Sequence, residues 1–172
     1  MDSEYNSVTV LTRSHSISGQ VSLRNRRFSD LLNDKRESAL IVNEASLARL
    51  SNPDSPIRHQ QLMIVPKNEI ALAFENDTAP GRPRNLYAYV RKVAHDVLLT
   101  LDGAEVSGCM HTNGPLSDLA LYEFVVTGAG DFFPVTEATV SFGENEHQTV
   151  NSSTVLVNRR RVHMISSIEV KG

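Results

Sequence analysis

Apolar and polar residues alternate along most of this chain. The alternation is clearest at residues 8–12 and 17–23. Successive side chains of an extended chain point to opposite faces, so a period of two predicts half-buried β-strands. Apolar runs of strand length follow at 39–50, 61–65, 69–74, 86–93, 97–101, 105–111, 132–142, 154–157 and 162–168. We therefore expect an all-β protein.

Turn-forming residues divide these strands. Asp102-Gly103 between two apolar runs is a strong signal for a hairpin. Polar loops are expected at 51–60 and 143–146, and the segment 78–85, with two prolines and a glycine, is typical of a linker. In the first part of the chain only residues 27–33 have helical character.

The same pattern occurs twice. Ile17-Ser18-Gly19 returns as Val106-Ser107-Gly108, and the Ser-Asp-Leu of 29–31 returns at 117–119. Val42-Asn43-Glu44-Ala45 parallels Val135-Thr136-Glu137-Ala138, and residues 64–70 parallel 156–162. The offsets are 89, 88, 93 and 92 (19 to 108, 30 to 118, 45 to 138 and 70 to 162), so only one sizeable insertion is needed, of five residues near 126–131. A repeat of this length indicates two similar structural units.

We expect the two units to be domains at 5–77 and 86–170, joined by the linker 78–85. Each would be a small barrel of about five strands with a short helical turn, because closing a barrel removes the unpaired edges of a sheet. Units this small bury a limited fraction of their surface, so packing of one unit on another is expected.

The strand order and the motif Val42-Asn43-Glu44-Ala45 resemble the Sm-like (Sm/SH3-like) small barrel, whose third strand often reads apolar residue, Asp or Asn, then Ala. The repeat is also similar to bacterial domains of uncharacterised function with a Ser-Asp-Leu-Leu-Asn signature, here residues 29–33. The Sm-like resemblance implies ring assembly by strand pairing. Sm-like proteins hold RNA partly through an Arg-Gly pair before the last strand, where this chain has Pro66-Lys67 and Asn158-Arg159. Ring assembly depends less on that pair.

Composition indicates a globular protein, with 40% hydrophobic and 22% charged residues. No apolar run approaches the roughly 18 residues that span a bilayer, so no membrane partner is expected. Residues 1–4 are acidic and lack the features of a signal peptide, and Cys109 has no partner for a disulfide. These features predict a cytoplasmic location. The net charge of −3 disfavours general binding to nucleic acid, which usually needs a basic excess.

Two small basic groups are candidates for contact with an anion or a nucleic acid. Arg159, Arg160 and Arg161 are consecutive, and Arg26 and Arg27 precede the expected helical turn. Guanidinium groups bind phosphate with two parallel hydrogen bonds. The alternative is that 159–161 form a solvated turn between strands, and that Asp30 and Asp34 offset the charge of Arg26 and Arg27.

The repeated Ser-Asp pairs have a structural interpretation. Asp30 and Asp118 could form an acid–base pair, but an Asp one residue after Ser at the start of a helical turn also bonds free backbone N–H groups. We expect Ser29, Asp30, Ser117 and Asp118 to cap their turns. The six histidines are scattered and lack metal-site spacing, and Cys109 sits in an apolar strand. No catalytic residue, metal or cofactor is therefore predicted.

These observations favour a non-enzymatic interaction or assembly protein that forms homo-oligomers through the edge strands of its barrels. Three copies would give a ring of six barrels if the rotation per barrel allows closure. One alternative is an Sm-like ring that binds nucleic acid through 159–161. A second is a regulatory module that binds a small molecule. Residues 66–69 and 158–161 differ between the repeats, so a specific site is expected where the repeats disagree.

Overall fold

The computed structural model describes residues 5–76, 92–142 and 148–168. The expected linker 78–85, most of the expected strand 86–93 and the expected loop 143–146 lie outside the described residues. The described ranges are called the first half (5–76) and the second half (92–168).

Each half contains five strands, one α-helix and one 3₁₀ turn. The first half consists of β1 (Tyr5–Leu11), β2 (His15–Ser22), α1 (Phe28–Asn33), β3 (Ala39–Arg49), β4 (Asn52–Pro66), η1 (Lys67–Glu69) and β5 (Leu72–Glu75). The second half consists of β6 (Val93–Leu101), β7 (Ala104–Thr112), α2 (Asp118–Thr127), β8 (Phe132–Phe142), β9 (Thr149–Asn158), η2 (Arg159–Arg161) and β10 (Val162–Ser167). The prediction of an all-β protein is confirmed.

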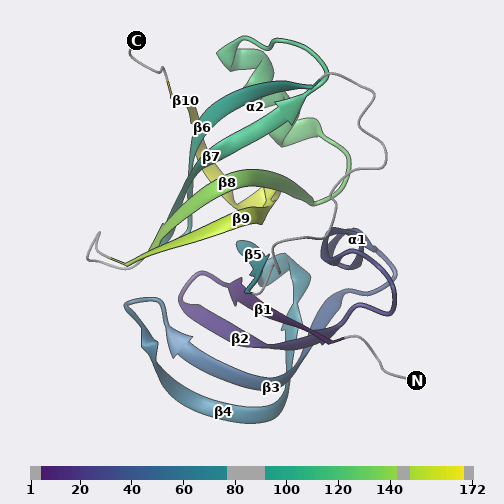
Figure 1. Cartoon of the computed structure of the whole chain (residues 1–172), viewed down its shortest axis with the longest axis vertical. Helices are drawn as coiled ribbons and strands as arrows, with labels where there is room; N and C mark the ends of the chain where they lie inside the picture. Colours follow the sequence, from purple (N-terminus) through teal and green to yellow (C-terminus); the bar gives the residue numbers. More distant parts are fainter. Residues whose placement is uncertain (1–4, 77–91, 143–147, 169–172) are drawn as a thin grey trace.

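All ten described strands pair antiparallel in one open sheet, in the order β10-β6-β7-β8-β9-β5-β1-β2-β3-β4 (Figure 1). The expectation that each repeat closes into its own barrel is therefore wrong. The reason lies in β5, the last strand of the first half. It pairs with β1 on one side and with β9 on the other, so it has no edge left for β4. The outer edges of β4 and β10 stay unpaired in this sheet.

The strand order within the two halves is the same, and a bulge recurs at the same place. Glu44 in β3 and Glu137 in β8 have positive φ angles of 46° and 49°. The bulged strand approaches the preceding strand so closely that a Cβ on Gly19 would lie 2.6 Å from the carbonyl oxygen of Asn43. A Cβ on Gly108 would lie 2.8 Å from that of Thr136. The glycines found by the repeat pattern therefore make room for the bulge.

The expected polar loop at 51–60 is wrong. Residues 52–60 belong to β4, which pairs with β3 from Asn52 to Pro66. The turn-forming residues of this segment gave a wrong prediction because β4 is an edge strand. Pro53 and Pro56 remove backbone donors, which an edge strand tolerates on its unpaired side. Most β4 side chains are exposed, so the segment lacks the alternation of a half-buried strand.

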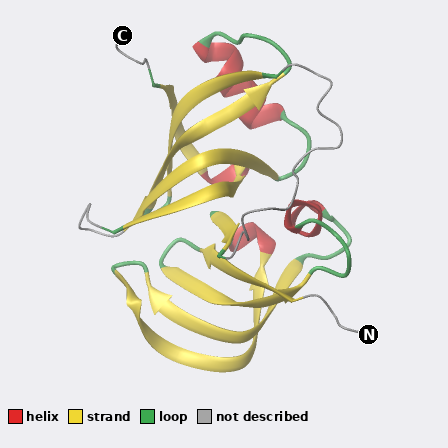
Figure 2. Cartoon of the chain, in the orientation of Figure 1, coloured by secondary structure: helices red, strands yellow, loops and turns green. Residues whose placement is uncertain are grey.

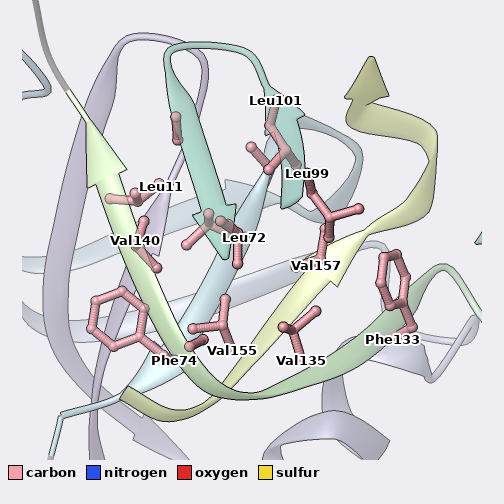
Figure 3. Close-up of a cluster of buried hydrophobic side chains, with 14 of the residues drawn as sticks. Leu11, Leu72, Phe74, Leu99, Leu101, Phe133, Val135, Val140, Val155 and Val157 are labelled. Atoms are coloured by element: carbon pink, nitrogen blue, oxygen red, sulfur yellow. The ribbon is translucent and has the colours of Figure 1, made fainter. Parts of the chain in front are cut away.

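Two hydrophobic clusters form the core, and each draws residues from both halves. Leu72 and Phe74 of β5 pack among second-half residues such as Val135 and Val157 (Figure 3). In the other direction, Phe132 and Leu156 of the second half belong to the cluster of the first half. The halves therefore share their core across the β5–β9 junction.

The two α-helices lie beside the strands of the sheet (Figure 2). α1 packs close to β8 of the other half, whereas α2 packs near η2 and β10 of its own half. With ten residues, α2 is longer than the short turn expected, because Leu121 and Val125 bury one side of it. None of the helices in the described ranges is long and apolar enough to cross a membrane.

Candidate interaction surface at the sheet edges

The junction between β5 and β9 joins the two halves. Leu72 lies opposite Val157, and Ala73 lies opposite Leu156. Asn158 extends the pairing: its backbone nitrogen donates to the carbonyl of Ala71 (2.9 Å), and its side-chain nitrogen donates to the carbonyl of Ile70 (2.8 Å). Asn158 is only 2% exposed, so this polar side chain is buried with its donors satisfied.

A second contact lies beside this junction. The side-chain amide of Asn33, at the end of α1, donates to the carbonyl of Phe132 (3.1 Å) and accepts from the backbone nitrogen of the same residue (2.9 Å). The amide of Asn33 thus forms with Phe132, the first residue of β8, the two hydrogen bonds that a neighbouring strand would form. Phe132 and Leu156 are 3% and 6% exposed, because residues of the first half cover them.

The equivalent positions at the free edge of β4 are not covered by another half. Ile64 is the counterpart of Leu156 at the offset of 92, and it is 64% exposed. Ile41, which lies opposite Ile64 on β3, is 49% exposed. Leu62 and Ile57 on β4 are also exposed. This apolar group of four residues is called the β4 edge.

The free edge of β10 has its own apolar group. Met164 is exposed on β10, and Ile168 is exposed directly after it. α2 lies alongside, since the hydroxyl of Ser167 donates to a carboxylate oxygen of Asp118 (2.7 Å). The exposed apolar residues of α2 and of the segment from β10 to Ile168, together called the β10 edge, are Leu119, Tyr122, Phe124, Val126, Met164 and Ile168.

The two edges concentrate the exposed apolar surface. Of the eleven large hydrophobic residues that are exposed in the described ranges, only Tyr5 lies on neither edge. Groups of exposed apolar residues of this kind are typical of interaction sites. The two edges lie toward opposite ends of the molecule, with β4 lowest and β10 near the top of Figure 1. A single chain therefore presents two different surfaces that face apart.

Arg159 caps α2 from η2. Its guanidinium donates to the carbonyls of Phe124 (3.1 Å), Val125 and Ala129, and its Nε donates to that of Gly130. The guanidinium carbon lies 5.3 Å from the centre of the Phe133 ring. Burial lowers the pKa of Arg159. A side chain held by four carbonyls at the end of a helix stabilises the fold.

The other two arginines of η2 also have partners. Arg160 forms an ion pair with Asp131 (3.2 Å), although its side chain remains 74% exposed. Arg161 donates to the carbonyl of Asn68 (2.9 Å) and lies near Glu69 (3.4 Å) and Asp102 (3.6 Å). It therefore links η2 to η1 of the first half. Of the three arginines of η2, Arg160 has the most exposed side chain.

Arg26 binds Asp34 and Glu37, both at 2.9 Å. Hydrogen bonds from Arg36 hold the pKa of the Asp34 carboxyl well below its ordinary value of 3.8. Arg27 stands before α1, and its backbone nitrogen donates to Asp30 (3.2 Å). The charges offset by Asp34 are thus those of Arg26 and Arg36.

The Ser-Asp pairs take different places in the two helices. α1 begins at Phe28, so its N-cap is Arg27, and Ser29 lies inside the helix. This differs from the expected cap because the helix begins at the buried Phe28, two residues earlier than a cap at Ser29 would place it. In α2, Ser117 is the N-cap and accepts from the backbone nitrogen of Ala120 (3.3 Å). Asp118 follows it in the first turn.

Three residues fix this part of the fold through contacts that the sequence did not predict. Lys67 is 8% exposed, and its ammonium donates to the carbonyls of Leu31 (2.6 Å) and Asp34 (2.9 Å). Burial lowers the pKa of Lys67. Asn33 and Asn158 are the other two. Neither asparagine has an equivalent asparagine in the other repeat, whereas Lys67 corresponds to Arg159 at the offset of 92.

Within the described ranges, no group of three or more His, Cys, Asp or Glu side chains could hold a metal ion. Cys109 is buried, and this burial raises the pKa of its thiol. A thiol in such surroundings is a poor nucleophile at neutral pH. No protein-family model, curated protein or solved structure matches this chain.

Proposed function

We propose that this chain is an assembly protein whose copies join head to tail. Strand β4 of one copy pairs antiparallel with strand β10 of the next copy, as β9 pairs with β5 inside the chain. The offset of 92 sets the register: Met164 lies opposite Val65, and Ile165 lies opposite Ile64. This register repeats the internal pairs Leu72–Val157 and Ala73–Leu156.

The observation that carries the proposal is the difference between Leu156 and Ile64. They occupy equivalent strand positions with side chains of similar size. Leu156 is 6% exposed because the other half covers it, and Ile64 is 64% exposed. A neighbouring copy at the β4 edge would bury Ile64 as the first half buries Leu156. Burial of a side chain of this size stabilises an interface by roughly 1.5–3 kcal/mol.

α2 takes part in the same contact. Leu31 of α1 is 4% exposed, whereas Leu119, which aligns with it at an offset of 88 but stands two residues nearer the start of its helix, is 68% exposed. α1 reaches the first residue of β8 through Asn33. If α2 is placed against the neighbouring copy as α1 is placed against β8, it faces the start of β3 in that copy, near Ile41. Both apolar edges are then covered.

The contact uses two different surfaces, so it is heterologous. Such contacts build a ring if the rotation per copy closes and a filament if it does not. A ring of three copies, with six similar halves, is supported by the resemblance to Sm-like barrels. The alternative of a nucleic-acid-binding ring requires free cations, and Arg159 and Arg161 are engaged within the protein.

Light scattering during size-exclusion chromatography tests the proposal. We expect a mass three times that of the 19.0-kDa chain, falling on dilution. Ile64→Asp and Met164→Asp should each give a folded monomer, because both side chains are exposed in the single chain. Tyr5→Asp is the matched control, since Tyr5 is 52% exposed away from both edges. A wild-type monomer at millimolar concentration, or equal effects of all three variants, would overturn the proposal.

A further inference from the structure

A pocket of about 870 Å³ lies between the two halves, at the end of the strands where the connecting turns of both halves meet. Its walls come from the β1–β2 turn, the β3–β4 turn and the β6–β7 turn, together with the end of β8. Pockets that hold small ligands have volumes of about 300–1,000 Å³. The pocket lies apart from the residues that form the two edges.

The floor of the pocket is apolar and buried. Leu50, Leu101, Ala104 and Phe142 line it, and each is 5–6% exposed. All four belong to one core cluster, although Leu50 comes from the first half and the other three come from the second. Because these side chains also pack in the core, the floor is a fixed surface.

Three turns, one from the second half and two from the first, approach each other closely here. Gly103 has a φ of +67°, and a Cβ at this position would lie 3.2 Å from both the carbonyl oxygen of Arg13 and the Leu50 side chain. The β6–β7 turn therefore touches the β1–β2 and β3–β4 turns directly. This contact keeps the pocket walls in place.

The rim of the pocket is cationic. Arg13 and Arg49 line it together with His15, and among the lining residues that the structure describes, Glu105 is the acidic one. Neither Arg13 nor Arg49 has a side-chain hydrogen bond or ion pair with any residue in the described ranges. The ring of His15 is oriented by a 2.8 Å hydrogen bond between its Nδ1 and the hydroxyl of Ser14. Two guanidinium groups are thus available to a ligand.

The cationic rim belongs to one half only. At the offset of 89, Arg13 corresponds to Asp102, which pairs with Arg161 and His163 instead. At the offset of 93, Arg49 corresponds to Phe142, whose side chain forms part of the floor. The site therefore lies where the repeats disagree. One wall supplies charge and the other supplies apolar surface.

We infer that this pocket binds an amphiphilic anion, with a carboxylate or phosphate head between Arg13 and Arg49 and an apolar body on the floor around Leu101 and Phe142. Guanidinium groups bind either head with paired hydrogen bonds. The apolar body is needed because exposed arginines alone hold a small anion weakly in water.

Calorimetric titration of the whole protein with octanoate and octyl phosphate, below their micellar concentrations, tests this site. Octanol and octyltrimethylammonium have the same chain without the anionic head. We expect binding of the two anions only, and at least a tenfold loss of affinity in the double variant R13Q/R49Q. Arg24→Gln, at an exposed arginine away from the pocket, is the matched control and should bind as the wild type does.

Backbone NMR shifts on adding octanoate locate the bound chain, and the better-bound anion identifies the preferred head group. Shifts centred on residues 13–15, 49–51 and 100–105 support the site. Equal binding of octanol and octanoate, full affinity in R13Q/R49Q, or shifts centred elsewhere would each overturn it. Circular dichroism of the variant separates lost binding from lost folding.

Discussion

The side chain of Asn158 donates a hydrogen bond to the carbonyl of Ile70, 88 residues earlier in the chain. Its backbone nitrogen bonds the next carbonyl, that of Ala71. The equivalent residue of the first half is Pro66, which has neither donor and stands at a free edge. The proposed contact between copies therefore lacks two hydrogen bonds that the internal junction has. It is expected to be reversible.

Pro66→Asn should tighten the assembly. The backbone angles of Pro66 (φ −56°, ψ 130°) and Asn158 (φ −74°, ψ 112°) are similar, so asparagine fits the position. Two hydrogen bonds contribute about 2 kcal/mol together, or roughly thirtyfold in the dissociation constant. Sedimentation equilibrium over a dilution series measures it. Pro56→Asn, on the same strand but away from the contact, is the control. An unchanged dissociation constant would argue against the proposed register.

Leu156→Ala should destabilise the single chain by about 2–5 kcal/mol, the usual effect of removing a large buried side chain. Ile64→Ala, at the equivalent position of the first half, should change the stability of the monomer by less than about 0.5 kcal/mol because Ile64 is exposed. Urea unfolding at micromolar concentration compares them. Equal losses would show that the two positions do not differ in the monomer.

Gly19→Ala should destabilise the fold by about 1–3 kcal/mol. The new Cβ would lie 2.6 Å from the Asn43 carbonyl and from a methyl carbon of Val42, so the bulge must shift. Gly114→Ala is the control, since nothing lies within 4 Å of a Cβ there. Thermal unfolding distinguishes the two. Gly19→Ala with wild-type stability would contradict the close approach seen at the bulge.

Arg159→Leu should cost about 2 kcal/mol of stability, because it leaves carbonyls at the end of α2 without a donor. Arg160→Leu should cost less than about 0.5 kcal/mol, since its ion pair is exposed. Chemical denaturation measures both variants. If Arg160 supported the fold more than Arg159 does, the role assigned to Arg159 in capping α2 would be wrong.

Asp34 makes stability depend on pH. Its pKa is lower in the folded protein than its ordinary value of 3.8, so the carboxylate stabilises the fold above that pH. This contribution is lost as the pH falls through the folded pKa. Asp34→Asn should therefore lower the melting temperature at pH 7, and the difference from wild type should shrink below pH 3.8. Asp54→Asn, at an exposed position with no ion pair in the described ranges, is the control. A difference that stays constant with pH would exclude this linkage.

The local pattern of the sequence predicted several elements because it is set by near neighbours. Alternation identified strands such as 132–142, and Asp102-Gly103 marked the β6–β7 hairpin. The recurrence of Gly19 as Gly108 indicated a structural constraint shared by both halves, and this constraint is the room needed for the bulge. The pattern failed at 52–60, where an edge strand with exposed side chains has the composition of a loop.

The candidate sites were harder to predict, since they depend on contacts far apart in sequence. Three consecutive arginines suggested one basic patch, but their side chains have three separate sets of partners. Arg13 and Arg49 are isolated in the sequence, and both line the pocket between the halves. The disagreement between repeats was the one signal that pointed to residues such as Asn158.

The sequence by itself determined that this is an all-β protein and which side chains of its half-buried strands face the core, because side-chain direction follows from the period of two. Only the tertiary structure decided which strand lies beside which. β5 can offer its second edge to β4 or to β9, and its own four residues do not encode the choice. The choice rests on contacts such as Asn158 with Ile70, about ninety residues apart, and it leaves β4 and β10 free.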